Sequence, residues 1–211
     1  MRSILAALLI GFTALACAQE HAQDLSKPML LVAQPKLRGP YSHTAVIVMP
    51  LGDKHIGFIL NRATGMHMAK AFPDHVPSQK VVDPIYFGGP EASDALFALV
   101  PHDPGEPSIH MFGELYMTGN RKNIDRIIEK TPNEARYFAG FVGWMPRELA
   151  QELAAGFWYV TEPDASQVFR KDTSHMWEEL VERLGGNPRR LRPAPGEREA
   201  LAPRSFVQEA M

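Results

Sequence analysis

The sequence predicts a single α+β domain built on a mixed β-sheet, and three observations support this prediction. Strand-like segments crowd the first half of the chain, whereas amphipathic helical patterns gather in the second half. The 211 residues are 45% hydrophobic and 22% charged, which is typical of a folded globular protein. The predicted domain, residues 29–186, is long enough to bury one sizeable core.

Three strands are expected at the start of this domain. Residues 29–33 are a continuous apolar run, which favours a strand buried on both faces. Residues 44–49 are rich in β-branched side chains, and residues 55–60 follow a turn-forming segment. The second and third strands are therefore predicted to pair as a hairpin.

The middle of the chain adds further short strands. They are expected over residues 85–87, 95–100 and 109–117, the last interrupted by Gly113. A short helix is expected at residues 66–72, within a segment rich in glycine and proline.

Three helices are expected in the second half. The first begins at Asn120, a favourable N-cap residue, and continues with isoleucines at helical spacing. The other two cover residues 146–155 and 174–184, and each is closed by glycine. Strands are expected at residues 135–141 and 157–160.

The first residues have the features of an export signal. A basic residue precedes an apolar stretch that is too short to span a bilayer comfortably, and small residues follow. We predict that residues 1–18 are a signal peptide cleaved after Ala18 and that residues 19–28 are a flexible lead-in, which makes the protein periplasmic or secreted. Two alternatives are a lipoprotein tethered to the membrane at Cys17 and a spurious or uncleaved signal, and a spurious signal would leave the chain in the cytoplasm.

Composition narrows the classes of function. The net charge of −2 and the pI of 6.4 argue against a protein that binds nucleic acid through bulk charge. The single cysteine excludes an intrachain disulfide framework.

Residues 187–211, rich in proline and arginine, are predicted to be a flexible tail.

Standard signatures of catalysis and cofactor binding are missing from the sequence. No GxGxxG, HExxH or GxSxG motif is present. Met and His residues at 66–68 and 110–111 are of the types that bind copper(I). Ser and His residues at 42–43 and 108–110 are of the types that act in hydrolases. Core packing and surface turns explain both groups more simply. We expect no catalytic residue, no metal and no cofactor.

Five residues are candidates for a ligand or partner surface: Asn61, Arg62, Gly88, Gly89 and Trp144. Asn61 and Arg62 end a strand, where they suit binding of an anion or a backbone segment. The preferred alternative is that Asn61 satisfies loop backbone groups while Arg62 pairs with a nearby acid. Gly88 and Gly89 permit close approach of another strand or a ligand, and Trp144 is expected in the core.

Four segments in order resemble the AlgH (YqgE) family of bacterial proteins, whose biochemical role is unsettled. They are the opening strand at 29–37, the Asn-Arg segment at 55–62, the Gly-Gly-Pro turn at 86–90 and the Gly-Trp segment at 140–149. The resemblance covers residues 29–184 and implies a branched mixed sheet that curls into a pseudo-barrel with flanking helices.

The resemblance implies no established enzyme activity. Family members often carry a transcriptional-regulator label, which the acidic charge and the predicted export of this chain oppose. Ala63 and Met145 depart from the family's usual proline and glycine, and typical members are cytoplasmic. We expect a non-catalytic exported protein that binds a protein or small ligand, with no nucleic-acid partner and membrane contact only through a lipidated Cys17. The alternatives are an enzyme of unknown reaction, such as a hydrolase, and a transcriptional regulator.

Overall fold

The structure is a computed structural model that describes residues 23–185. The expected signal peptide, cleavage at Ala18, lipidation at Cys17 and the tail at 187–211 lie outside these residues. The strands are β1 (Met29–Ala33), β2 (Ala45–Leu51), β3 (Lys54–Ile59), β4 (Ala63–His67), β5 (Pro84–Phe87), β6 (Glu91–Val100), β7 (Ile109–Phe112), β8 (Leu115–Thr118), β9 (Arg136–Trp144) and β10 (Trp158–Thr161). The helices are α1 (Met68–Ala71), η1 (Val76–Lys80, a 3₁₀ turn), α2 (Arg121–Lys130), α3 (Glu148–Ala154), α4 (Ala165–Val168) and α5 (Met176–Gly185).

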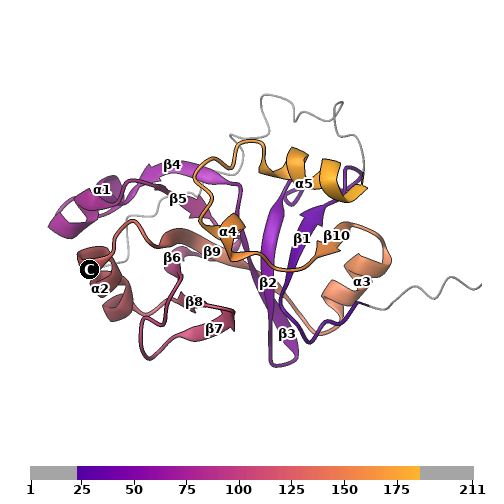
Figure 1. Cartoon of the computed structure of the whole chain (residues 1–211), viewed down its shortest axis with the longest axis horizontal. Coiled ribbons are helices and arrows are strands. Elements are labelled where there is room, and N and C mark those ends of the chain that lie inside the picture. Colours follow the sequence, from indigo (N-terminus) through magenta and orange to yellow (C-terminus); the bar gives the residue numbers. More distant parts are fainter. Residues whose placement is uncertain (1–22, 186–211) are drawn as a thin grey trace, which may run out of the picture.

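These strands form one curled sheet with a branch at β9 (Figure 1). The main path runs β10-β1-β2-β3-β9-β6-β8-β7. One edge of β9 pairs with β6, while the other pairs first with β5 in parallel and then with β3 antiparallel. The predicted α+β domain with a mixed, branched and curled sheet is therefore confirmed.

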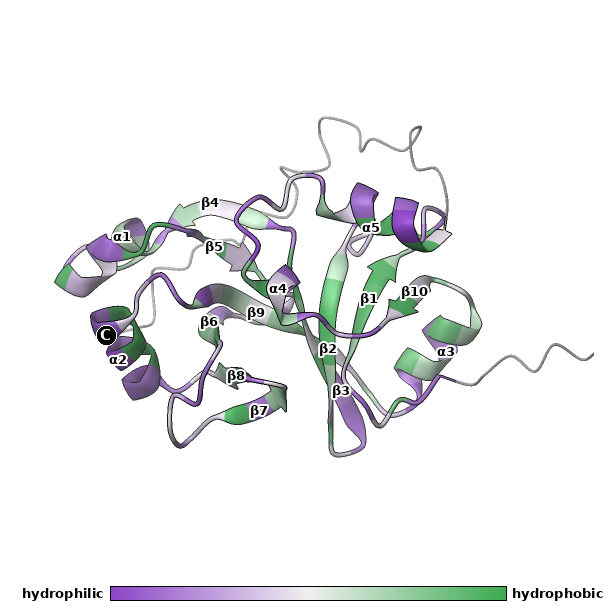
Figure 2. Ribbon diagram, viewed as in Figure 1, coloured by the Kyte–Doolittle hydropathy of each residue, from purple (hydrophilic) through white to green (hydrophobic). Residues whose placement is uncertain are grey.

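Helices gather at the two ends of the sheet, and each end has its own core. In Figure 1, α1 and α2 lie beside β4, β5 and β6, whereas α3 and α5 lie beside β1 and β10. Figure 2 shows apolar residues along β1 and β2 and polar residues on the outward faces of α2 and α5. One core cluster surrounds β1, β2 and β3, and the other lies between α2 and strands β5, β6 and β9.

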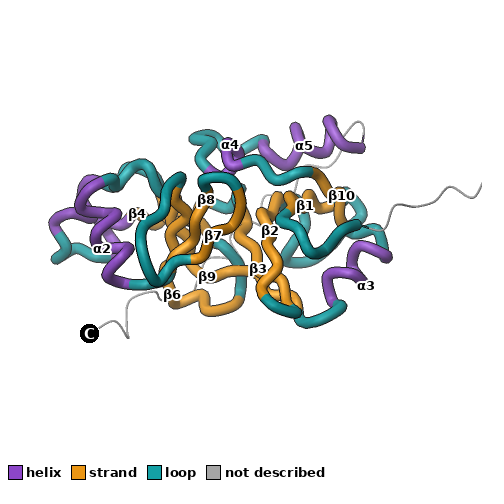
Figure 3. Tube along the Cα trace, turned by 60° about the horizontal axis from the view of Figure 1, so that its bottom comes forward, coloured by secondary structure: helices purple, strands orange, loops and turns teal. Residues whose placement is uncertain are grey.

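Most of the predicted elements are present. The strand at 29–33 is buried at every position, and the hairpin of β2 and β3 turns at residues 52–53. The Asn120 side chain accepts a hydrogen bond from the Asn123 N–H, so this residue caps α2 as predicted. Figure 3 shows the strands in the middle of the molecule with the helices around them.

Three predictions of local structure were wrong in detail. Met66 and His67 belong to β4, because exposed and less exposed side chains alternate there and the strand pairs with β5; only Met68–Ala71 is helical. The strand expected at 109–117 is a hairpin that turns around Gly113, which adopts a positive φ of 52°. Strand β9 continues to Trp144, beyond the expected end at residue 141. Elements β4, η1 and α4 were not predicted.

Candidate functional site

Asn61 and Arg62 hold the loop that connects β1 to β2. The Asn61 side chain accepts a hydrogen bond from the Ala45 N–H (3.0 Å) and donates one to the His43 carbonyl (2.8 Å). Arg62 Nη2 donates to the Ser42 carbonyl at 3.0 Å. His43 has a positive φ of 56°, an uncommon conformation for a non-glycine residue. From their position just after β3, the two side chains therefore brace a strained stretch of backbone that immediately precedes β2.

Gly88 and Gly89 lie where the sheet branches. The Gly88 N–H donates to the Ala139 carbonyl, and the Gly88 carbonyl accepts from the Ile59 N–H. A Cβ added at Gly88 would lie 2.1 Å from the Gly140 carbonyl oxygen, and one at Gly89 would lie 2.2 Å from the carbonyl carbon of Phe141. Only glycine fits this passage of one backbone across another. Another strand, not a ligand, therefore occupies the space beside both glycines.

Trp144 belongs to an aromatic cluster at the far end of β9. It is 3% exposed, and its indole ring meets Trp158 edge-on at 6.5 Å between centroids. Both indole N–H groups donate to the same oxygen of Glu152, Oε2, at 2.9 and 2.7 Å. The expected core position of Trp144 is confirmed.

Tyr41 connects this cluster to the braced loop. Its ring lies 6.4 Å from Trp158, and burial raises the pKa of its phenol, with Glu152 and Glu91 acting in the same direction. Arg62 acts in the opposite direction on the same pKa. The structure thus places Asn61, Arg62 and the glycines at the branch of the sheet, while Trp144 reaches the loop through Trp158 and Tyr41.

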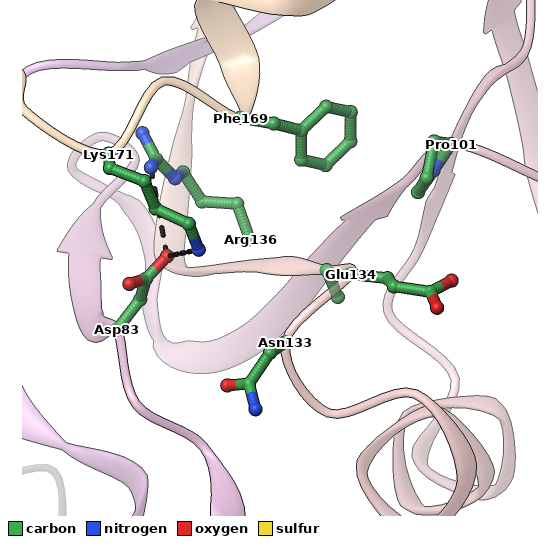
Figure 4. A pocket seen from close by; sticks show the side chains of 8 residues that line it. Asp83, Pro101, Asn133, Glu134, Arg136, Phe169 and Lys171 are labelled. Atoms are coloured by element: carbon green, nitrogen blue, oxygen red, sulfur yellow. Dashed lines mark hydrogen bonds and ion pairs between the residues drawn. The ribbon is translucent and has the colours of Figure 1, made fainter.

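A pocket of about 330 Å³ lies away from these five candidates (Figure 4). It opens between the start of β9, the loop before β5 and the segment after α4. The lining residues are Asp83, Pro101, Asn133, Glu134, Ala135, Arg136, Phe169 and Lys171. Sequence reasoning missed this site, because its residues come from segments far apart in the chain.

Arg136 is the unusual member of the pocket. It is 1% exposed, and its guanidinium lies 4.3 Å from the centroid of the Tyr86 ring. Its Nη2 donates to the Arg170 carbonyl at 2.5 Å and lies 3.9 Å from the Asp83 carboxylate. Burial lowers the pKa of Arg136, and Tyr86 and Asp83 oppose that shift, but a guanidinium stays charged in proteins.

Two nitrogens of this buried cation have no acceptor in the part of the chain that the structure describes. Among residues 23–185, Nε and Nη1 of Arg136 find no hydrogen-bond partner although both are buried. Such groups are rare in folded proteins because an unsatisfied buried donor is costly. One sequence signal could have indicated the site: Arg136 is a charged residue at the start of an otherwise apolar strand.

The residues considered for copper or nucleophilic chemistry do not come together. Met68 packs in the core cluster beside α2, whereas Met111 packs in the cluster around β1. His110 contacts the Gly113 carbonyl, and Ser108 donates to Asp103. No group of three or more His, Cys, Asp or Glu side chains suited to a metal is present within the described residues.

None of the helices described between residues 23 and 185 is long and apolar enough to cross a membrane.

The fold and pocket define a single-domain α+β protein with a branched, curled sheet. The profile of the family described as AlgH-like matches residues 30–189. The chain belongs to the AlgH-like family.

Relatives and solved structures agree with this assignment. A UPF0301 protein from Cytophaga hutchinsonii is 25% identical to this chain, and the match covers 77% of this chain and 92% of the relative. A UPF0301 protein from Chlorobium luteolum is 27% identical, and the match covers 81% of this chain and 92% of the relative. The solution structure of the AlgH protein from Pseudomonas aeruginosa superposes with a TM-score of 0.64 at 23% identity, covering 77% of this chain and 90% of that one. A crystal structure from Corynebacterium diphtheriae gives a TM-score of 0.63 at 21% identity, covering 82% and 90%. These structures support the fold.

Proposed function

We propose that this protein is an exported, non-catalytic binding protein and that its ligand site is the pocket beside Arg136. The observation that carries the proposal is the buried guanidinium whose Nε and Nη1 have no acceptor in the described part of the chain. A protein retains such a group at a cost in stability, and a ligand in the adjoining pocket would supply the missing contact.

The five residues selected from the sequence are weaker candidates for the ligand site. The Asn61 and Arg62 hydrogen bonds described above go to the backbone of the β1–β2 loop, and strand contacts fill the space at Gly88 and Gly89. The two glycines let the chain pass closely against β9, the strand on which Arg136 lies.

Binding is tested by capture and by thermal stability. The full chain is incubated with a periplasmic extract, and the filtrate of small molecules from the same extract is added separately in a thermal-shift assay. We expect the filtrate to raise Tm, because a ligand that binds only the folded state stabilises it. Recovery of no partner together with no rise in Tm would contradict the binding function.

Export is tested by cell fractionation and mass spectrometry of the N-terminus. The proposal expects a periplasmic chain that starts at Gln19, after cleavage at Ala18. A lipidated Cys17 would replace soluble export with a membrane tether. An intact Met1 in the cytoplasmic fraction would overturn export.

A further inference from the structure

The pocket is lined by two cations and two carboxylates, and these charges are unevenly placed. Arg136 and Lys171 both approach one carboxylate oxygen, Oδ2 of Asp83, at 3.9 and 2.9 Å. Glu134 lines the opposite side, where it lies 3.9 Å from the ring of His102 and is 59% exposed. Two cations therefore share one close carboxylate, so the Arg136 side of the pocket carries a local excess of one positive charge, although Glu134 makes the lining as a whole neutral.

The remaining walls of the pocket include apolar groups. Figure 4 shows Phe169 and Pro101 across the pocket from Lys171, and Ala135 immediately precedes β9. A ligand that fills this space would have a compact apolar body. Its charged end would face the side formed by Asp83, Lys171 and Arg136.

Resting on the proposed binding function, we propose that the ligand is a small monocarboxylate with an apolar body. One negative charge matches the local excess of positive charge beside Arg136, whereas the second charge of a phosphate dianion would have no cation left to pair with and would be repelled by Asp83 and Glu134. A carboxylate supplies acceptors for both Lys171 and Arg136.

Lys171 is the accessible part of this site. Its side chain is 67% exposed and lies beside the Arg136 guanidinium and Asp83 (Figure 4). Rotation of Lys171 away from Asp83 would open the guanidinium to the incoming carboxylate, and the ammonium would then bind the same anion. Because Lys171 is exposed, its replacement tests ligand binding at the pocket without disturbing the hydrophobic core.

The test measures binding of defined probes to the full chain by titration calorimetry. Benzoate and butyrate are the monocarboxylate probes, benzylamine carries a similar apolar body with the opposite charge, and inorganic phosphate is the competing oxyanion. We expect saturable binding of benzoate, weaker binding of phosphate and none of benzylamine. Tighter binding of phosphate than of benzoate, or equal binding of benzylamine, would overturn the assignment of a monocarboxylate.

Two variants in the pocket, Lys171→Glu and Arg136→Met, and one control outside it locate the binding. Lys171→Glu is expected to weaken benzoate binding by about tenfold or more, since one charge-assisted contact is lost and a repulsive charge is added. Lys54→Glu makes the same charge change at an exposed position of β3 and is expected to leave binding unchanged. Arg136→Met is expected to abolish binding, and Lys171→Glu provides the answer if that core variant does not fold. Equal weakening by the two glutamate variants would show a nonspecific charge effect and refute the site.

The ligand class and the binding function fail in distinguishable ways. If the monocarboxylates do not bind but the extract filtrate raises the Tm of the unmodified chain and not that of Lys171→Glu, the proposed class is wrong and the site stands. If neither the probes nor the filtrate bind, both proposals are wrong.

Discussion

The indole nitrogen of Trp144 donates a 2.9 Å hydrogen bond to Oε2 of Glu152, joining the end of β9 to helix α3. The same oxygen accepts from Trp158 on β10. One carboxylate therefore fixes two buried indoles that come from different strands. This arrangement ties β9 and β10, which do not pair in the sheet, to α3.

Replacement of Glu152 by Ala should destabilise the protein. Two buried indole N–H groups would lose their acceptor, at a cost of about 1–3 kcal/mol each before relaxation. Glu152→Gln keeps one acceptor oxygen and should lose less. Urea unfolding followed by tryptophan fluorescence measures both effects. Gln151→Ala, an exposed neighbour on α3, is the control, and an equal loss in that variant would contradict the role of Glu152.

Replacement of Gly88 by Ala should prevent normal folding or cost about 3 kcal/mol or more, because overpacking against backbone cannot be relieved by a rotamer change. The added Cβ would lie 2.1 Å from the Gly140 carbonyl oxygen. Gly143→Ala is the matched control on β9, where the nearest atom is a side-chain carbon of Glu91 at 3.4 Å. Soluble yield and chemical denaturation should separate the two variants. Similar stabilities would show that the branch tolerates a side chain.

Asn61→Asp should loosen the β1–β2 loop without unfolding the sheet. The aspartate keeps the acceptor for the Ala45 N–H but places a second acceptor against the His43 carbonyl. We expect a loss of about 1–3 kcal/mol, since a satisfied group becomes unsatisfied. Hydrogen exchange should accelerate at the loop amides, with the central amides of β2 as the internal reference. Uniform acceleration across β2 would indicate global destabilisation instead.

Stability should fall at alkaline pH because of Tyr137. This residue is 1% exposed, its hydroxyl donates to the Pro132 carbonyl, and burial raises the pKa of its phenol above the ordinary value of 10.0. The unfolded chain loses that proton near pH 10 and the folded chain keeps it, so the stabilisation is complete below pH 10 and declines above it. The decline is at most about 1.4 kcal/mol per pH unit for this group.

Tyr137→Phe separates the two contributions of the hydroxyl. At pH 8 the variant should be less stable by about 1 kcal/mol, because the hydrogen bond to Pro132 is lost. Between pH 10 and 11 its Tm should fall less steeply than that of the unmodified chain. An equally steep decline would assign the alkaline sensitivity to other groups.

The apolar strand of residues 29–33, the β2–β3 hairpin and the capped helix at Asn120 could be predicted from the sequence, since each depends on side chains that are neighbours along the chain. The resemblance to the AlgH family also supplied the branched sheet. Strand β4 and helix α4 escaped prediction because short segments carry little periodic signal.

The side chains of the candidate sites were harder to predict. Asn61 and the two glycines could be recognised from the sequence as candidates for a binding surface. Whether a ligand or the protein's own backbone occupies the space beside them depends on the tertiary structure, in particular on the path of β9 past the glycines. The pocket was not predicted at all, although Arg136 is a charge at the start of an apolar strand.

The sequence by itself determined the class of fold, the family and the local elements, because hydrophobic periodicity, caps and turns act over a few residues. Only the tertiary structure decided that Asp83, Arg136 and Lys171 share one pocket. Such a meeting depends on strand order and on how one edge of β9 is divided between β5 and β3, and these long-range pairings leave no local trace in the chain.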